Sequence, residues 1–482
     1  MDRLDTPLSP TLSPQAERRS NASRVWATVR EAVRGSHQDF TEGPIGRAIL
    51  LLAIPMVMEM MMESVFAIAD IFWVSKLGAD SVATVGITES MLALIYAVAI
   101  GVSVSATAMV ARRIGEKDPE HAASAAVQAI ALGIGLAIPI GITGALLAPK
   151  LLAFMGGSPS LVATGWRYTA IMLGGNVVIL LLFLINAIFR GAGDAAIAMR
   201  VLWFANILNI VLGPCFIFGL GPFPKLGVTG AAVATTIGRG SGVLYQLWTL
   251  SRGRGRVVIE RRHLKLDPAV MLRLLRLSGN AIFQIMIGTA SWIGLVRILS
   301  GFGSAALAGY TIGIRIIVFA LLPSWGMANA AATMVGQSLG ARKPDRAERS
   351  VWIAGFYNMI FLGAVGLTFV LAAPILIRLF TSDAAVVPYG VACLRFVSYG
   401  FLFYAYGMVL TQAFNGAGDT WTPTWLNLFC FWLWEIPLAY VLAKVVGLGP
   451  RGVFIAITIA FSTLAVASAA VFRLGHWKLK KV

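Results

Sequence analysis

The sequence predicts an all-α membrane protein in which twelve transmembrane helices form two six-helix, pseudo-symmetric lobes around a central cleft. Of the 482 residues, 58% are hydrophobic and only 13% are charged, and the mean hydropathy is +0.79. Apolar runs of about 20–30 residues, long enough to cross a bilayer, recur along the whole chain. The two halves of the chain also share turn motifs at one fixed spacing.

The predicted spans follow one another with short connections. They cover residues 46–74, 82–110, 122–147, 161–188, 196–219, 227–250, 272–299, 304–335, 350–377, 390–414, 421–446 and 452–474. The first six form an N-lobe (46–250) and the last six a C-lobe (272–474), with a basic linker at 251–271 between them. A polar N-terminal tail (1–45) and a short basic tail (475–482) flank the two lobes.

The basic residues between the spans predict the orientation. One set of connections is rich in Arg and Lys, at 112–117, 190–200, 252–276, 342–349 and 478–481, and we assign Arg190 to it. Cytoplasmic loops carry the excess of Arg and Lys, so this set and both termini are expected in the cytoplasm. The chain is then a multi-pass protein of the cytoplasmic (inner) membrane. Topology also explains the net charge of +17, so no nucleic-acid partner is expected.

The fixed spacing between the halves is the one that separates Gly78 from Gly303, and we call it the repeat offset. It also relates Gly115 to Gly340, and the FRGAGD turn that ends at Asp194 to the FNGAGD turn that ends at Asp419. Each half has six spans and therefore begins on the same side of the membrane. The repeats are parallel, an arrangement typical of alternating-access transporters with the substrate site between the halves.

The first span carries three carboxylates, Glu59, Glu63 and Asp70. At about 100° per residue, Glu63 lies about 40° around the helix from Glu59, and Asp70 about 20° from Glu63, so all three share one face. A carboxylate at membrane depth costs on the order of 2.5 kcal/mol or more unless it faces protein or water. The stripe predicts the wall of a polar cavity, with packing between helices as the alternative.

Two further acids, Glu89 and Glu435, lie at membrane depth. The four N-lobe acids correspond, at the repeat offset, to Gln284, Gly288, Leu295 and Ile314, none of them acidic. Protonation is therefore expected mainly in the N-lobe. A carboxyl group outside water can exchange a proton near neutral pH, and competition with a cation for that group is the minimal mechanism of an antiporter.

Other polar residues in the spans supplement this hypothesis. Asn206 and Asn209 could hydrogen-bond to the first-span acids or only within the bundle. Arg239, Arg297 and Arg315 could pair with acids, and Glu89, Gln284 and Glu435 are candidates for the cleft wall, with packing as the alternative for Glu435. Aromatic and Met side chains on the cleft side would suit flat, apolar cations. The four histidines lie outside the spans, which argues against a His-ligated metal site within the membrane.

The motifs together resemble the multidrug and toxic compound extrusion (MATE) family over residues 46–474. The resemblance is carried by IP…DIFWVSKLGA in span one, VARRIGEKD after span two, the paired FRGAGD and FNGAGD turns, NIVLGPCFIFG in span five and LGVTGAA at span six. It implies twelve helices in two lobes and export of organic cations in exchange for protons or sodium ions.

The resemblance also implies roles for single residues. Asp70 matches the span-one aspartate of cation coupling, with sodium as the alternative ion there. Pro55 matches a proline whose bend accompanies protonation, and Asn209 an asparagine of the same network. The chain departs from the family at Gly213, where an aspartate is common, and in spans seven and ten, which lack the acids of sodium coupling. Glu59 and Glu63 are hypothesised to replace the lost aspartate.

Two alternatives remain. A flippase for a lipid-linked or amphipathic metabolite would need a basic cleft to hold phosphate, whereas the first lobe is acidic. A membrane enzyme would need a catalytic or metal cluster at an interface, and we identify none in the sequence. We expect a non-enzymatic monomer without cofactor that contacts small organic cations and membrane lipids.

Overall fold

The computed structural model describes residues 26–36 and 38–480, which are almost entirely helical and contain no strand. By length and composition, ten described helices could each cross a membrane, and eleven if a bent helix pair counts as one span. The predicted fold class is thereby confirmed. The predicted sixth span, α8 (Val228–Ser251), is 24 residues long but less apolar than these ten, because it contains Thr, Ser, Gly, Arg239 and Gln246.

The N-lobe contains seven helices. They are α2 (Ile45–Ser75), α3 (Ala79–Gly115), α4 (Pro119–Phe154), α5 (Pro159–Gly174), α6 (Asn176–Ala192), α7 (Ala195–Phe218) and α8. Several extend past the predicted bounds, because a helix can continue into the water layer until a cap or turn stops it. The side chain of Asp118, for example, accepts a hydrogen bond from the His121 backbone N–H at the start of α4.

The C-lobe repeats this order after a short 3-10 turn, η1 (Arg261–Leu264). Its helices are α9 (Pro268–Ser300), α10 (Ser304–Gly340), α11 (Pro344–Arg378), α12 (Val387–Tyr399), α13 (Phe401–Gly416), α14 (Trp421–Asn427), the π-helical segment η2 (Leu428–Glu435), α15 (Ile436–Tyr440), the π-helical segment η3 (Val441–Val445) and α16 (Pro450–Arg473). A last 3-10 turn, η4 (His476–Leu479), follows.

The fourth span of each half is broken at a glycine, which the sequence analysis did not predict. Gly175 separates α5 from α6, and Gly400, its equivalent at the repeat offset, separates α12 from α13. The α12–α13 pair is bent by 61°. The repeat extends to unusual backbone angles: Lys117 and Arg342, also equivalent, have φ of 58° and 59°. The internal repeat therefore holds at the level of single dihedral angles.

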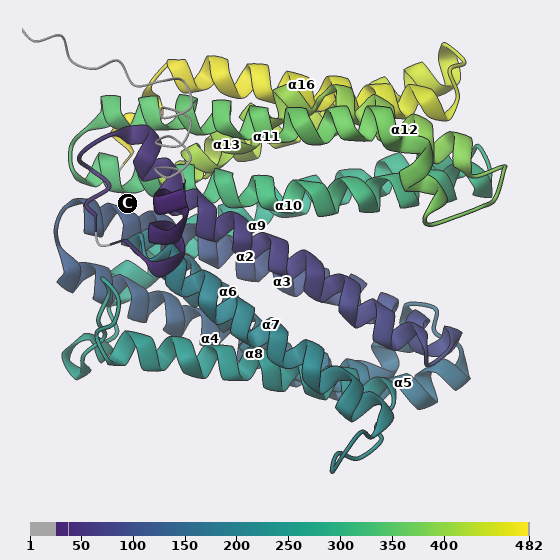
Figure 1. The fold of residues 1–482 in the computed structure, drawn as a ribbon, viewed down its shortest axis with the longest axis horizontal. Helices are drawn as coiled ribbons and strands as arrows, with labels where there is room; N and C mark the ends of the chain where they lie inside the picture. Colours follow the sequence, from purple (N-terminus) through teal and green to yellow (C-terminus); the bar gives the residue numbers. More distant parts are fainter. Residues whose placement is uncertain (1–25, 37, 481–482) are drawn as a thin grey trace, which may run out of the picture.

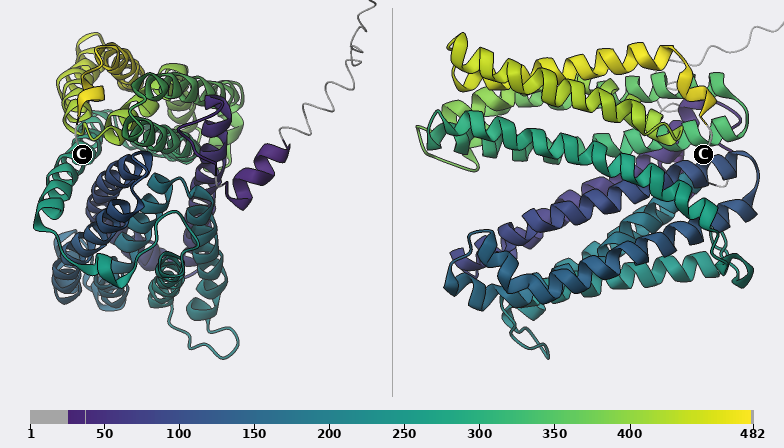
Figure 2. Two further views of the ribbon diagram at one scale, coloured as in Figure 1. Left: turned by 90° about the vertical axis from the view of Figure 1, so that its left-hand side faces the viewer. Right: turned by 180° about the vertical axis from the view of Figure 1, so that it is seen from behind.

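The two lobes meet at one end of the molecule and spread apart toward the other (Figures 1 and 2). We call the end at which α3 and α10 terminate the closed end, and the end at which they begin the open end. In Figure 1 the C-terminus lies at the closed end. The second helix of each half packs on the first helix of the other half. In the N-lobe this helix is α3, which packs on α9, and in the C-lobe it is α10, which packs on α2.

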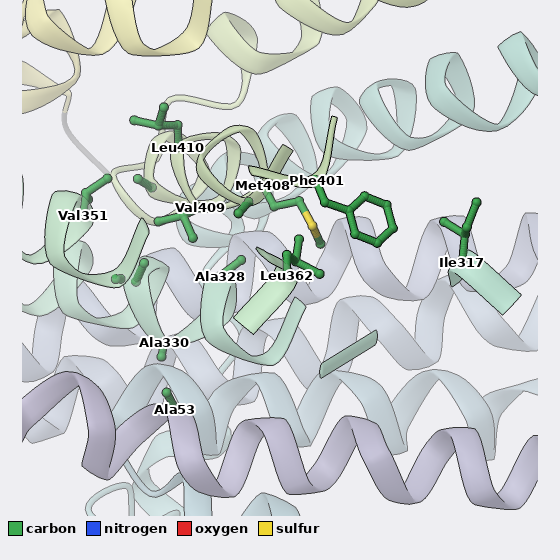
Figure 3. Close-up of a cluster of buried hydrophobic side chains, with 14 of the residues drawn as sticks. Ala53, Ile317, Ala328, Ala330, Val351, Leu362, Phe401, Met408, Val409 and Leu410 are labelled. Carbon is green, nitrogen blue, oxygen red and sulfur yellow. The ribbon is translucent and has the colours of Figure 1, made fainter. Parts of the chain in front are cut away.

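The first helix of each half lies partly in the core of the other lobe. Six residues of α2 between positions 48 and 56, including Ile49 and Met56, belong to the hydrophobic core of the C-lobe. Leu274 of α9, the equivalent of Ile49, belongs to the core of the N-lobe. Figure 3 shows Ala53 of α2 facing Ala330 of α10. Pro55 therefore lies beside Met56, the last residue of α2 in this core.

A segment before α2 connects the lobes at the closed end. Residues 26–34 are helical, and residues 38–43 form what we call the strap. The Arg346 guanidinium of α11 donates to the backbone oxygens of Phe40, Glu42 and Gly43 at 2.8–3.1 Å. Arg256, which follows α8, donates to Gln38 O at 2.6 Å and lies over the buried Phe40 ring. Residues 1–25 of the predicted N-terminal tail lie outside the described residues.

We predict that Arg346→Gln releases the strap. Hydrogen bonds to a charged donor contribute about 1.5–3 kcal/mol, and about 1.4 kcal/mol is a tenfold change in an equilibrium. Tryptic cleavage after Arg34 should therefore accelerate by about tenfold or more. Arg349→Gln is the matched control, since Arg349 is an exposed arginine of the same helix. Equal cleavage rates in the two variants would contradict a docked strap.

Candidate functional site

A cavity of about 220 Å³ lies between the lobes, and Glu59 and Glu63 of the first-span stripe line it, whereas Asp70 does not. Its N-lobe wall comes from α2, α3, α6 and α7, and its C-lobe wall from α10 and α13. We call it the N-lobe cavity. The side chains that line it are Glu59, Met60, Glu63, Tyr96, Ile100, Ser103, Val104, Thr107, Leu182, Phe183, Asn186, Arg190, Leu202, Leu322, Trp325, Asn329, Ala332, Gln412 and Asn415, together with Gly416.

Glu59 is only 1% exposed and forms a buried ion pair. Its Oε1 accepts hydrogen bonds from Arg190 Nη1 at 2.6 Å and from Asn186 Nδ2 at 3.0 Å. Asn186 is oriented in turn by Gln246, whose Nε2 donates to Asn186 Oδ1 at 2.7 Å. The other carboxylate oxygen, Oε2, is buried and has no hydrogen-bond partner among the described residues. Glu59 therefore presents one satisfied and one unsatisfied oxygen.

The position of Arg190 differs from the prediction of the sequence analysis, which placed this residue in a basic loop. It belongs to the last turn of α6, and its side chain is 10% exposed. Its position within the FRGAGD motif suggested an interfacial residue, and only the fold shows that α6 turns it toward α2. Its backbone oxygen accepts a hydrogen bond from Thr333 Oγ1 of the C-lobe at 3.0 Å. Arg190 thus contacts the cavity with its side chain and the opposite lobe with its backbone.

Glu63 also has a buried arginine partner. Its Oε1 lies 3.3 Å from Arg239 Nη2, and its Oε2 accepts from Asn206 Nδ2 at 3.0 Å. Arg239 is 3% exposed and donates through Nη1 to the Tyr96 hydroxyl at 2.7 Å. Asn206 and Arg239 therefore bind a first-span acid as anticipated. Asn209 does not, because its amide donates to Thr235 Oγ1 at 2.8 Å.

Asp70 lies apart from this cavity, nearer the open end of α2. It is half-buried, and the described residues offer it no hydrogen bond or close ion pair. The charges that act on it belong to Glu89 and Arg239. Glu89 is exposed on α3 and interacts electrostatically with Arg315 of α10, across the two lobes. Asp70 is therefore the carboxylate of the stripe without a short-range partner.

A second cavity, of about 420 Å³, lies against the C-lobe, and we call it the C-lobe cavity. Gln284 lines it, together with Asn427, Phe431 and Trp292. Glu435 lines neither cavity. It is 2% exposed at the end of η2 and interacts electrostatically with Tyr404 and Cys430. Within the described part of the chain, no group of three or more His, Cys, Asp or Glu side chains could hold a metal ion.

We predict that removing only one partner of the Glu59–Arg190 pair strongly destabilises the folded protein. Arg190→Gln leaves a buried, unpaired carboxylate, and removing one partner of such a pair typically costs about 3–5 kcal/mol. The melting temperature of the purified protein should fall strongly in Arg190→Gln and recover in part in the double variant with Glu59→Gln. Arg262→Gln breaks the exposed pair with Glu120 and should have little effect. A double variant that melts no higher than Arg190→Gln alone would contradict the pairing.

Comparison with known proteins assigns the family. A family model described as MatE matches residues 55–215 and 281–441, one stretch in each half. The probable multidrug resistance protein YoeA of Bacillus subtilis is 23% identical over 442 residues, which cover 91% of this chain and 95% of that protein. The probable multidrug resistance protein NorM of Thermotoga maritima is 24% identical over 447 residues, which cover 91% and 94%.

A solved structure agrees with these matches. The crystal structure of MATE in complex with MaL6 superimposes with a TM-score of 0.85 at 29% identity, over 92% of this chain and 99% of that one. The matched stretches contain α2 from Pro55 onward, with its carboxylates, and the equivalent parts of the C-lobe. The resemblance seen in the sequence motifs is confirmed, and the chain belongs to the MatE family of membrane transporters.

Proposed function

We propose that this protein is a secondary active antiporter that exports organic cations in exchange for protons by alternating access. The observation that carries the proposal is the carboxylate of Asp70, which has no short-range partner among the described residues and lies near the Arg239–Glu63 pair. We call Glu63, Asp70 and Arg239 the Arg239 cluster. With all three groups ionised it carries a net charge of −1.

The remaining acids of the N-lobe spans in the described chain have a basic group nearby. Glu59 pairs with Arg190, and Glu89 faces the charge of Arg315. One negative charge is therefore left to be neutralised, either by a proton on Asp70 or by a cationic substrate. Binding of one excludes the other, and an exchange of one proton for one monovalent cation follows.

The distribution of basic residues supports an orientation for the transporter. Arg112, Arg113 and Lys117 lie where α3 passes into α4, and Arg342 and Lys343 where α10 passes into α11, both at the closed end. By the positive-inside rule the closed end faces the cytoplasm, with both termini, and the protein lies in the cytoplasmic membrane. The cavities then belong to an outward-facing state.

The surface supports a single chain surrounded by lipid. Large apolar side chains are exposed along the spans, among them Leu146 (76%), Ile293 (70%) and Leu371 (71%). Such side chains match the acyl chains of a bilayer. We propose a monomer that uses no cofactor and has no enzymatic step. A flippase is not favoured, because each arginine on or behind the N-lobe cavity is already paired with a glutamate.

We predict that Asp70→Asn abolishes proton-driven export. Liposomes that contain the purified protein would be loaded with ethidium, and either a proton gradient or a sodium gradient would be imposed across their membrane. The native protein should export ethidium with the proton gradient only, and Asp70→Asn should not. Asp80→Asn, at the exposed start of α3, is the matched control. Export driven by sodium would overturn proton coupling, and no export with either gradient by folded protein would overturn the antiporter.

We predict further that Glu63→Gln weakens ethidium binding by roughly tenfold or more, because Asp70 and Arg239 then balance each other and the cluster has no net charge. The measurement is ethidium fluorescence on protein in nanodiscs at constant pH, with Asp80→Asn again as the control. Unchanged affinity in Glu63→Gln would contradict the charge balance of the Arg239 cluster.

A further inference from the structure

A small cavity lies at the closed end, where the helix of residues 26–34 covers the beginning of α7. Its volume is about 60 Å³, and in Figure 2 the purple helix that covers it stands at the outer edge of the molecule. Three arginines line it, Arg34 from this helix, Arg200 from α7 and Arg254 from the segment after α8. We call it the arginine cavity.

The three arginines have no carboxylate within ion-pair distance among the described residues. Arg200 Nε donates to the backbone oxygen one turn earlier in α7, at 3.1 Å, which leaves both Nη groups for a ligand. The one acid of the described lining is Asp194, whose carboxylate accepts a hydrogen bond from the Arg256 backbone N–H and lies 3.7 Å from Arg256 Nε. The arginine cavity therefore has an excess of positive charge and free N–H donors.

The volume restricts what can enter. Sites for whole drug-sized molecules have volumes of roughly 300–1,000 Å³, so this cavity suits a small group at the end of a larger molecule. Guanidinium groups match the geometry of phosphate oxygens and bind them through two parallel hydrogen bonds. A phosphate group thus fits both the size and the charge of the arginine cavity.

Arg200 begins a stripe of exposed side chains on α7. Phe204, Ile207 and Val211 follow it on the same face of the helix and are 47–56% exposed. Asn206, which bonds inside the lobe, lies about 200° around the helix from Phe204, so the stripe faces away from the lobe interior. The apolar side chains of the stripe match the acyl chains of a bilayer.

Aromatic rings connect this stripe to the arginine cavity. Phe204 contacts Tyr245 of α8 with 6.1 Å between the ring centroids, and Tyr245 contacts Trp248 at 6.0 Å. The Arg254 guanidinium lies 4.3 Å from the centroid of the Trp248 ring. Tyr and Trp side chains gather at the level of the lipid headgroups. The arginine cavity therefore lies where a bilayer changes from acyl chains to headgroups.

The C-lobe repeats the stripe without the arginine. At the repeat offset Phe204 corresponds to Phe429, which is 50% exposed, whereas Arg200 corresponds to Trp425, which is 61% exposed. Contact with acyl chains accounts for the exposed rings on both lobes. It does not account for the arginine on one of them, which indicates a ligand specific to the N-lobe.

We propose that the arginine cavity binds the phosphate of an anionic phospholipid from the leaflet at the closed end. The phosphate oxygens accept hydrogen bonds from the three arginines, and one acyl chain lies along the stripe on α7. Basic pockets on the cytoplasmic side of membrane helices bind anionic headgroups in this way. The lipid ties the helix of residues 26–34 to the N-lobe. This site is separate from the transported compound and from the coupling ion, and its test does not depend on either.

The test counts bound lipids. Native mass spectrometry of the full-length protein in detergent micelles would follow titration with phosphatidylglycerol or with phosphatidylcholine of the same acyl chains. Each arginine beside an anionic headgroup contributes about fivefold in affinity. The first phosphatidylglycerol should therefore bind at least about tenfold more tightly than the first phosphatidylcholine. Equal affinities for the two lipids would overturn the proposal.

Variants locate the preference. Replacing all three arginines of the cavity with Gln should weaken binding of the first phosphatidylglycerol by about tenfold or more and leave phosphatidylcholine unaffected. The matched control combines Arg273→Gln, Arg276→Gln and Arg349→Gln, which remove three exposed arginines from the first turns of α9 and α11. It lowers the net charge equally and should bind both lipids as the native protein does. An equal loss in the two triple variants would reduce the effect to general surface charge and overturn the site.

A soluble compound separates a lipid site from a site for free phosphate groups. Glycerol 3-phosphate has the phosphate without the acyl chains, so it lacks contact with the stripe. We expect it to leave phosphatidylglycerol bound even in large excess. If it displaces phosphatidylglycerol at equal concentration, the cavity takes a soluble phosphate compound and the assignment to a lipid is wrong.

Discussion

The close packing of two helix pairs at the closed end is the constraint on which the rest of the structure depends. At Gly115 a Cβ atom would overlap the backbone of Gln337, and at the equivalent Gly340 it would overlap the backbone of Arg112. These are the same contact made twice, once from each lobe. Gly326 of α10 also approaches the backbone of Met56 too closely for a Cβ atom to fit, although less closely than these two glycines approach theirs. Because α2 and α10 touch here, the acids further along α2 are held against a cavity that both lobes share.

The repeat preserves this framework while the chemistry of the two halves differs. Backbone angles and glycine contacts recur at the repeat offset, whereas the N-lobe acids have no acidic counterparts in the C-lobe. Residues at the contact between the lobes are constrained in pairs, since each lobe supplies half of the interface. Residues that line a cavity are constrained one by one, by the groups that they bind. One lobe can therefore hold paired charges and an unpartnered aspartate, while the other presents rings and amides.

The sequence predicts most of the fold and only part of the site, for physical reasons. Apolar runs and repeated turns are local, so the spans, the lobes and the shared face of Glu59 and Glu63 follow directly. The breaks at Gly175 and Gly400 were missed because a glycine inside an apolar run does not distinguish a bend from close packing. Arg190 was misplaced because its role depends on the direction in which α6 faces. Asn206 and Asn209 differ by less than one helical turn, and only the packing of α7 on α2 and α8 decides which of them reaches an acid.

The strap has a consequence for the order in which the protein is made. Phe40 and Arg346, which hold each other at the closed end, are separated by 306 residues. At about 5–20 residues per second, the strap emerges from the ribosome roughly 15–60 s before its partner does. It can dock only when α11 stands beside α2, and that requires both lobes to be inserted. Docking of the strap is therefore a late step of biogenesis, and a chain with an unfinished C-lobe exposes its N-terminus to proteases.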